Sequence, residues 1–197
     1  MENFVYSIPT EIYFGKGQIV NIGDIVSRYG KKALLVYGGG SIKRNGIYND
    51  VVKIFKENGI AWCELSGVEP NPRITTVREG VKLCREEGVE VLVPIGGGST
   101  IDCAKVIAGA VSYDGDAWDI VLNPAKVVSV LPIVTVLTLS ATGSEMDTFA
   151  VISNLETNDK IGTGHEDMRP KASILDPSYT CSVSAYQTAA GTAEILV

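Results

Sequence analysis

The sequence is poor in histidine and in the basic residues that bind nucleic acid. His165 is the only histidine among 197 residues, so this chain alone cannot form a multi-histidine metal site or a histidine proton relay. Lys and Arg number 17 against 23 Asp and Glu, which gives a formal net charge of −6. Binding to a phosphate backbone depends on cationic side chains that displace the counterions of the phosphates. Because this chain has no excess of such side chains, nucleic acid is not an expected partner.

Paired cysteines and long apolar runs are also absent. The four cysteines, Cys63, Cys84, Cys103 and Cys181, are too widely spaced for a zinc knuckle or a redox dithiol, so we expect buried free thiols. No stretch approaches the roughly 20 apolar residues of a membrane helix. The N-terminus lacks the basic start and apolar core of a signal peptide. We therefore expect a soluble cytoplasmic protein with no membrane partner.

Short apolar, β-branched runs alternate with amphipathic segments over the first 110 residues. This alternation is typical of buried parallel strands joined by crossover helices, and it predicts a doubly wound α/β fold. Expected strands are 32–37, 60–65 and 90–95, and expected helices are about 43–58, 73–87 and 100–110. Beyond residue 116 the pattern weakens. We expect strands at 127–134, 149–153 and 172–175, a β-hairpin, and a helix from residue 184.

A glycine-rich turn at residues 96–99 follows an expected strand and opens an expected helix. The backbone N–H groups of such a turn, with the helix dipole behind them, face any anion at the carboxyl edge of the sheet. Glycine allows close approach, because a side chain would obstruct a pyrophosphate. The alternative is a tight turn that binds nothing. Asp102, one turn into the helix, either points at a ligand or is an exposed acid near the dipole.

A second glycine turn at residues 38–41 occupies the same place after an earlier strand. The adenosine ribose of a dinucleotide would lie there if the pyrophosphate lay on the later turn. No acid stands at this turn to bind a ribose 2′-hydroxyl, whereas Ser41, Lys43 and Arg44 suit a 2′-phosphate. The sequence thus favours NADP, with NAD as the alternative. Lys43 and Arg44 could also be a solvated helix start, although cations are unfavourable near a helix N-terminus.

Five stretches match one known family in the family's own order. They are PTEIYFGKG (9–17), YGGGS (37–41), GVEPNPR (67–73), GGGSTIDCAK (96–105) and LTLSATGSE (137–145). The chain resembles the iron-containing alcohol dehydrogenases, in particular their butanol dehydrogenase-like, NADP(H)-using branch. The resemblance implies a Rossmann-like domain of the dehydroquinate synthase type, mostly parallel with an appended hairpin. It also implies that the family's all-helical C-terminal domain is missing from this chain.

The resemblance also assigns the cofactor contacts. Gly97, Gly98 and Ser99 would hold the pyrophosphate. The adenosine ribose and its 2′-phosphate would be flanked by Gly38, Gly39 and Ser41. The remaining cleft residues would be Asn71, Asp102, Thr138, Thr142, Lys160 and Tyr179. Four of these also have a simpler interpretation: turn hydroxyls for the two threonines, a surface charge for the lysine, and packing beside Pro177 for the tyrosine.

The family's reaction is reversible hydride transfer between nicotinamide and a primary alcohol or aldehyde, in homodimeric enzymes. A divalent metal, Fe or Zn, polarises the carbonyl oxygen and is held by one Asp and three His. Glu194 stands where that Asp would be, and the next His would fall just beyond Val197. Residues 1–183 would then be the nucleotide-binding domain and 184–197 the start of a truncated metal-binding domain. We expect this chain alone to be inactive.

Asp147 stands where related reductases often carry Asn near the nicotinamide, and a carboxylate there would favour the oxidised ring. Two alternatives to the dehydrogenase remain. One is a non-catalytic nucleotide-binding or scaffolding domain, indicated by the missing histidines. The other is a polyol dehydrogenase or a dehydroquinate synthase-like lyase, although the stretch 138–145 is closer to the aldehyde reductase branch.

Overall fold

Six parallel strands form the central sheet of the molecule. The computed structural model describes the backbone of residues 8–195 and the side chains of residues 8–193. The strand order is β1-β8-β5-β4-β2-β3, and every neighbouring pair is parallel. The strands are β1 (Glu11–Phe14), β2 (Lys32–Tyr37), β3 (Ala61–Leu65), β4 (Val91–Gly96), β5 (Val134–Leu137) and β8 (Ala172–Leu175). The predicted doubly wound α/β fold is confirmed.

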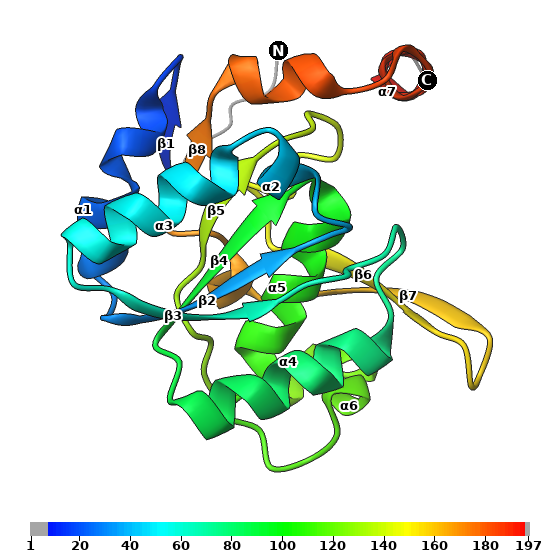
Figure 1. The fold of residues 1–197 in the computed structure, drawn as a ribbon. Helices are drawn as coiled ribbons and strands as arrows, with labels where there is room; N and C mark the ends of the chain where they lie inside the picture. The colour runs from blue at the N-terminus through cyan, green and yellow to red at the C-terminus, as the bar shows by residue number, and fades with distance from the viewer. Residues whose placement is uncertain (1–7, 196–197) are drawn as a thin grey trace, which may run out of the picture.

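Helices cover both faces of this sheet (Figure 1). One face packs against α1 (Ile22–Ser27) and α3 (Ile47–Glu57), and the other against α4 (Ile74–Glu87), α5 (Gly98–Ala110) and α6 (Ala117–Leu122). The two resulting cores contain fully buried side chains such as Phe55 on α3 and Ile107 on α5. Among the described helices, none combines the length and the apolar character that a membrane crossing requires.

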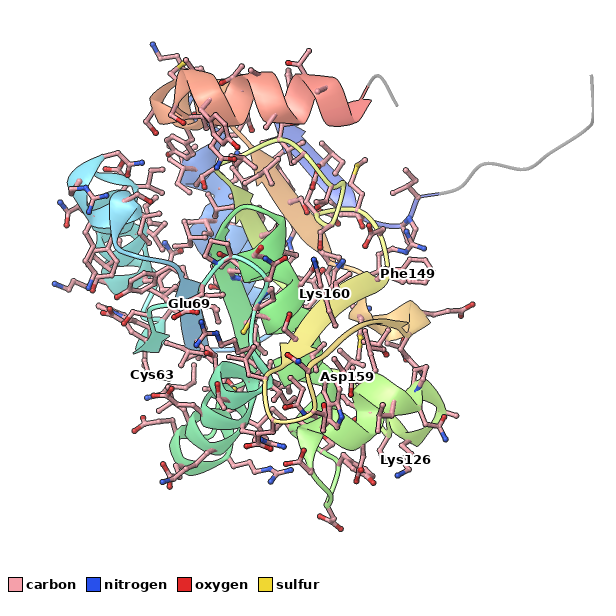
Figure 2. The ribbon with its side chains drawn as sticks, turned by 90° about the vertical axis from the view of Figure 1, so that its right-hand side faces the viewer. Cys63, Glu69, Lys126, Phe149, Asp159 and Lys160 are labelled. Atoms are coloured by element: carbon pink, nitrogen blue, oxygen red, sulfur yellow. The ribbon has the colours of Figure 1, made fainter. Side chains whose placement is uncertain are left out.

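Further helices and a hairpin complete the described fold. These helices are α2 (Ser41–Arg44), α7 (Ala185–Ile195) and the 3-10 helices η1 (Gln18–Asn21), η2 (Pro124–Lys126), η3 (Glu166–Met168) and η4 (Pro177–Ser182). The predicted hairpin is a separate antiparallel pair of β6 (Phe149–Asn154) and β7 (Asp159–Gly164). Figure 2 shows this hairpin with Phe149 at its start and Asp159 and Lys160 beyond its turn. Its strand β6 packs against α5, and its strand β7 packs against α6.

Two expected elements differ in the structure. The helix expected at 43–58 is divided into α2 and α3, because Gly46 adopts a φ of 86° that ends one helix and starts the other. The strand expected at 127–134 is wrong: β5 begins at Val134, and residues 127–133 contribute only a single bridge, from Ile133 to Leu92. The edge strand β1 was not predicted, because its short run leaves Ile12 and Phe14 exposed and shows no buried pattern.

The cysteines also differ from expectation. Cys84 and Cys103 are buried as expected, but Cys63 is half-buried and Cys181 is exposed. Burial raises the pKa of both the Cys84 and the Cys103 thiols to about 12. The thiolate is the reactive form of cysteine. These two thiols are therefore protected against modification both because burial excludes the reagent and because they stay protonated.

We therefore expect iodoacetamide at pH 8 to alkylate Cys181 first and Cys63 more slowly, while Cys84 and Cys103 stay unmodified in the folded chain. Peptide mass spectrometry after timed quenching would measure the four rates, and urea should make all four sites reactive. Alkylation of Cys103 as fast as Cys181 in native buffer would contradict the described core.

Candidate functional site

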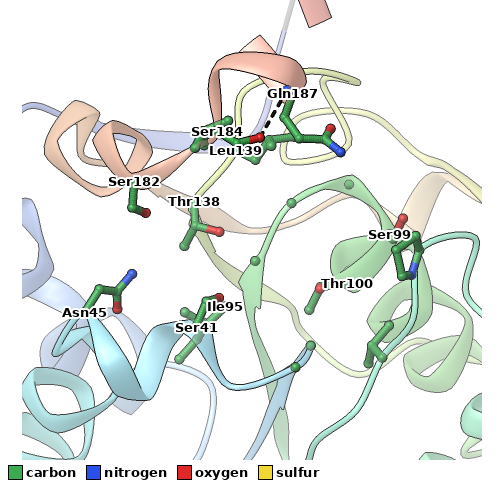
Figure 3. A pocket seen from close by; sticks show the side chains of 18 residues that line it. Ser41, Asn45, Ile95, Ser99, Thr100, Thr138, Leu139, Ser182, Ser184 and Gln187 are labelled. Atoms are coloured by element: carbon green, nitrogen blue, oxygen red, sulfur yellow. Dashed lines mark hydrogen bonds between the residues drawn. The ribbon is translucent and has the colours of Figure 1, made fainter. Parts of the chain in front are cut away.

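A cleft opens at the carboxyl ends of β2 and β4, where both glycine turns meet. Carboxyl ends of parallel strands share one edge of the sheet, and ligands of open α/β sheets bind in the crevice there. The cleft has a volume of about 470 Å³. Seven of the predicted residues line it: Gly38, Gly39, Ser41, Gly97, Gly98, Ser99 and Thr138. Figure 3 shows Ser41 and Asn45 on one side of this cleft and Ser184 and Gln187 on the opposite side.

The turn after β4 leaves the N-terminus of α5 without a side-chain cap. Gly97 is the N-cap residue and has extended dihedral angles, φ −91° and ψ −169°. A Cβ at Gly98 would lie 2.5 Å from Oγ1 of Thr142, and one at Gly97 would lie 3.3 Å from Cβ of Leu139. The absence of side chains thus lets the 138–142 loop close against the turn. First-turn N–H groups of an uncapped helix suit an anion such as a pyrophosphate, so the residues present fit that group.

The turn after β2 lies on the other side of the same cleft. Gly40 has a φ of 87°, which favours glycine, and it precedes the first residue of α2, Ser41. Lys43, expected to face a 2′-phosphate, instead forms an ion pair at 3.1 Å with Glu64 of the neighbouring strand β3. An acid therefore does lie near this turn, but it comes from a different strand. The sequence pattern at the turn itself could not show it.

A second cavity of about 670 Å³ continues the groove toward α7. The two cavities share Ser99, Leu139, Val183 and Gln187. Asn71 lines the second cavity, and its Oδ1 accepts a hydrogen bond of 2.8 Å from Nζ of Lys160. The predicted residues Asn71 and Lys160, which are 89 positions apart, are therefore in direct contact. The groove runs from the ribose turn past the pyrophosphate turn to this pair.

Four predicted residues line neither cavity: Lys160, which reaches the second one only through Asn71, and Asp102, Thr142 and Tyr179. Asp102 accepts hydrogen bonds from Oγ of Ser144 at 2.6 Å and from the backbone N–H of Val151 at 3.0 Å. Burial raises its pKa, although these hydrogen bonds oppose the rise. Thr142 is exposed and packs over the glycine turn. Tyr179 is half-buried against the core beside α3, and burial raises its pKa to about 12. In this structure Asp102 anchors the hairpin to α5.

The described residues do not supply the donor set of the implied metal. Glu194 belongs to α7, but its side chain lies outside the described part of the chain. Among the side chains that are described, no group of three or more His, Cys, Asp and Glu could hold a metal ion. His165 caps η3, accepting a hydrogen bond from the N–H of Asp167 at 3.3 Å. No step of a reaction can therefore be assigned to a metal from these residues.

A buried lysine is the main site feature that the sequence analysis missed. Lys105 is fully buried on α5, and its Nζ donates to Oδ1 of Asp147 at 2.6 Å, to Oγ of Ser144 at 2.9 Å and to the carbonyl of Phe149 at 2.8 Å. Asp147, expected near the nicotinamide, is thus paired with Lys105. The sequence signal was a single lysine among the apolar residues 103–110 of this helix. Asn45, Ser182, Ser184 and Gln187 also line the cleft, and no motif marks them.

The fold and the cleft define a Rossmann-like α/β domain with a glycine-lined groove at the carboxyl edge of its sheet. The family model described as iron-containing alcohol dehydrogenase matches residues 9–177. This chain therefore belongs to the iron-containing alcohol dehydrogenase family, as the resemblance of the five stretches predicted.

Individual relatives agree with this assignment. The NADH-dependent butanol dehydrogenase A of Clostridium acetobutylicum is 63% identical over 196 residues, covering 100% of this chain and 50% of that protein. The NADPH-dependent aldehyde reductase of Escherichia coli is 39% identical over 200 residues, covering 100% of this chain and 51% of that protein. A crystal structure of NADH-dependent butanol dehydrogenase A from Thermotoga maritima matches with a TM-score of 0.93 and 44% identity, covering 98% of this chain and 49% of that one. The chain thus spans about half the length of these relatives.

Proposed function

We propose that this chain is the cofactor-binding part of an NAD(P)-dependent dehydrogenase that interconverts primary alcohols and aldehydes. The observation that carries the proposal is the uncapped N-terminus of α5 opening on a groove that both glycine turns line. The proposal is also supported by the names of the similar proteins, which include butanol dehydrogenases and an aldehyde reductase. The whole enzyme is proposed to be a cytoplasmic homodimer that acts on a small alcohol or aldehyde.

The proposed roles follow the groove. The N–H groups of Gly98 and Ser99 bind the pyrophosphate, and the turn at Gly38 and Gly39 holds the adenosine ribose. Thr138, fixed by its N–H bond of 3.0 Å to the carbonyl of Gly96, borders the path toward the second cavity. A bound nicotinamide dinucleotide supplies the hydride acceptor or donor of the reaction. The division at residue 183 and the metal role of Glu194 stay predictions.

The proposed cofactor is NADP(H), with NAD(H) as the alternative. Ser41 lines the cleft beside the ribose turn, and Arg44 is exposed on α2, so both suit a 2′-phosphate. The pairing of Lys43 with Glu64 weakens this preference, and the similar proteins bear both NADH-dependent and NADPH-dependent names.

Titration of the purified chain with NADPH and with NADH, followed by nicotinamide fluorescence, tests the proposal. We expect saturable enhancement and competition by the oxidised cofactors, because binding transfers the ring from water into the groove. Absence of a saturable signal for both cofactors at about millimolar concentration, corresponding to roughly −4 kcal/mol, would refute it. Consumption of NADPH by butanal is expected only from a longer protein that supplies the missing metal ligands.

A further inference from the structure

Glu64 is the acceptor at the centre of a polar cluster beside the ribose turn. It lies on β3, and its carboxylate accepts hydrogen bonds from the hydroxyls of Tyr37 (2.5 Å) and Tyr48 and from Nζ of Lys43 (3.1 Å). Burial pushes the pKa of Glu64 upward, but these three donors outweigh it, so the pKa lies below its ordinary value. Glu64 is therefore ionised at neutral pH.

Lys43 is held from several sides in this cluster. Its Nζ lies 5.1 Å from the ring centroid of Tyr37 and 4.5 Å from that of Tyr48, in addition to the ion pair with Glu64. Contacts with Tyr37 and Glu64 raise the pKa of Lys43, so the pair consists of a full cation and a full anion. The cation is nevertheless accessible, because 48% of the lysine side chain is exposed.

The cluster is joined to the cleft by the backbone. Tyr37 directly precedes Gly38 of the ribose turn, and Lys43 is two residues beyond Ser41, which lines the cleft. On the β3 side, the N–H of Gly67 donates to the carbonyl of Gly38 at 3.1 Å, and the next residue, Val68, lines the cleft. Glu64 thus pairs with a lysine within the short helix that adjoins the ribose turn.

We propose that Glu64 limits the preference for NADP by neutralising Lys43, so that Glu64 is a residue that determines specificity at the ribose 2′ position. This inference rests on the proposed dinucleotide site. With the ion pair intact, a 2′-phosphate gains little from Lys43, because Glu64 already occupies the ammonium group and adds a negative charge of its own. A 2′-hydroxyl is uncharged, so it responds to these two charges much less than a 2′-phosphate does. NADH affinity therefore depends little on the pair, whereas NADPH affinity depends on both of its members.

The test compares dissociation constants for NADPH and NADH in the full chain and in three variants. Glu64→Gln retains hydrogen-bonding capacity for the tyrosines but frees the ammonium group, so NADPH should bind about five- to tenfold more tightly relative to NADH. Lys43→Gln leaves the carboxylate unbalanced and should shift the ratio in the opposite direction. The double variant should return close to the original ratio, which a purely structural role of Glu64 would not produce.

Thermal unfolding monitored by circular dichroism confirms that each variant is folded before titration. An unchanged ratio in Glu64→Gln, or the same gain in the double variant, would overturn the inference. Failure of the unmodified chain to bind either cofactor would instead refute the proposed function. The two failures are therefore distinguishable.

Discussion

Gly97→Ala is expected to lower the affinity for NADPH and NADH alike by about 2–3 kcal/mol, or roughly 30- to 150-fold. The methyl group would enter the space between the α5 N-terminus and Leu139, only 3.3 Å from the leucine Cβ. The methyl group would push the 138–142 loop away from the turn, and Thr138 and Leu139 of that loop line the same cleft as the first residues of α5. Because charge-assisted hydrogen bonds weaken steeply with distance, a cleft altered in this way should hold the pyrophosphate less well against the first N–H groups of α5.

The backbone itself should accept this alanine. Gly97 has extended dihedral angles that any residue can adopt, and replacing glycine there lowers the entropy of the unfolded chain. Gly162→Ala is the matched control, because its Cβ would meet nothing within 4 Å at an exposed position of β7. The free energy of unfolding of each variant should lie within about 1 kcal/mol of that of the original chain. Unchanged cofactor affinity in a folded Gly97→Ala chain would remove the pyrophosphate assignment.

The sequence predicted the parallel core well, because buried strands and crossover helices carry their own periodicity. Strands β2, β3 and β4 and helices α4 and α5 were expected within two residues of their observed ends. The periodicity fails where local geometry overrides it. Gly46 divides a helix whose two halves continue one apolar pattern, and β5 is a strand of four residues preceded by extended chain that pairs with almost nothing.

The candidate site, like the fold, could be predicted from the sequence only in part. Glycine turns are visible in sequence because the backbone geometry itself requires the residue type, and both turns reach the cleft. Side-chain partners across the fold carry no such local signal. The Glu64–Lys43 pair joins residues 21 positions apart, and the bond between Asp102 and Ser144 spans 42. Asp102 was therefore placed in the cleft by motif, whereas the structure occupies both of its carboxylate oxygens elsewhere.

Lys105→Met is expected to reduce the free energy of unfolding by about 3–5 kcal/mol at pH 7, because one member of a buried charged group is removed. The ammonium group makes three hydrogen bonds that methionine cannot replace: to Asp147, to Ser144 and to the Phe149 carbonyl. Its loss would leave Asp147 without its ion-pair partner and would remove a compensating positive charge from the partly buried carboxylate of Asp102, which shares Ser144 with Lys105. The hairpin and the 138–149 loop should then separate from α5, so cofactor affinity should fall together with stability.

The pH dependence of this loss has a defined sign. Burial raises the pKa of Asp102, and the charge of Lys105 opposes part of that rise, so the methionine variant should raise this pKa further. A carboxyl group whose folded pKa lies above its unfolded pKa favours the folded state at low pH, and this contribution is lost as the pH rises through the folded pKa. The difference in free energy of unfolding between the two chains should therefore be smaller at pH 5 than at pH 7, as urea unfolding would measure.

Lys53→Met, on the exposed side of α3, is the control variant and should change the free energy of unfolding by less than about 0.5 kcal/mol. If the loss of stability caused by Lys105→Met were instead larger at pH 5 than at pH 7, Asp102 would not be the carboxylate that loses its compensating charge.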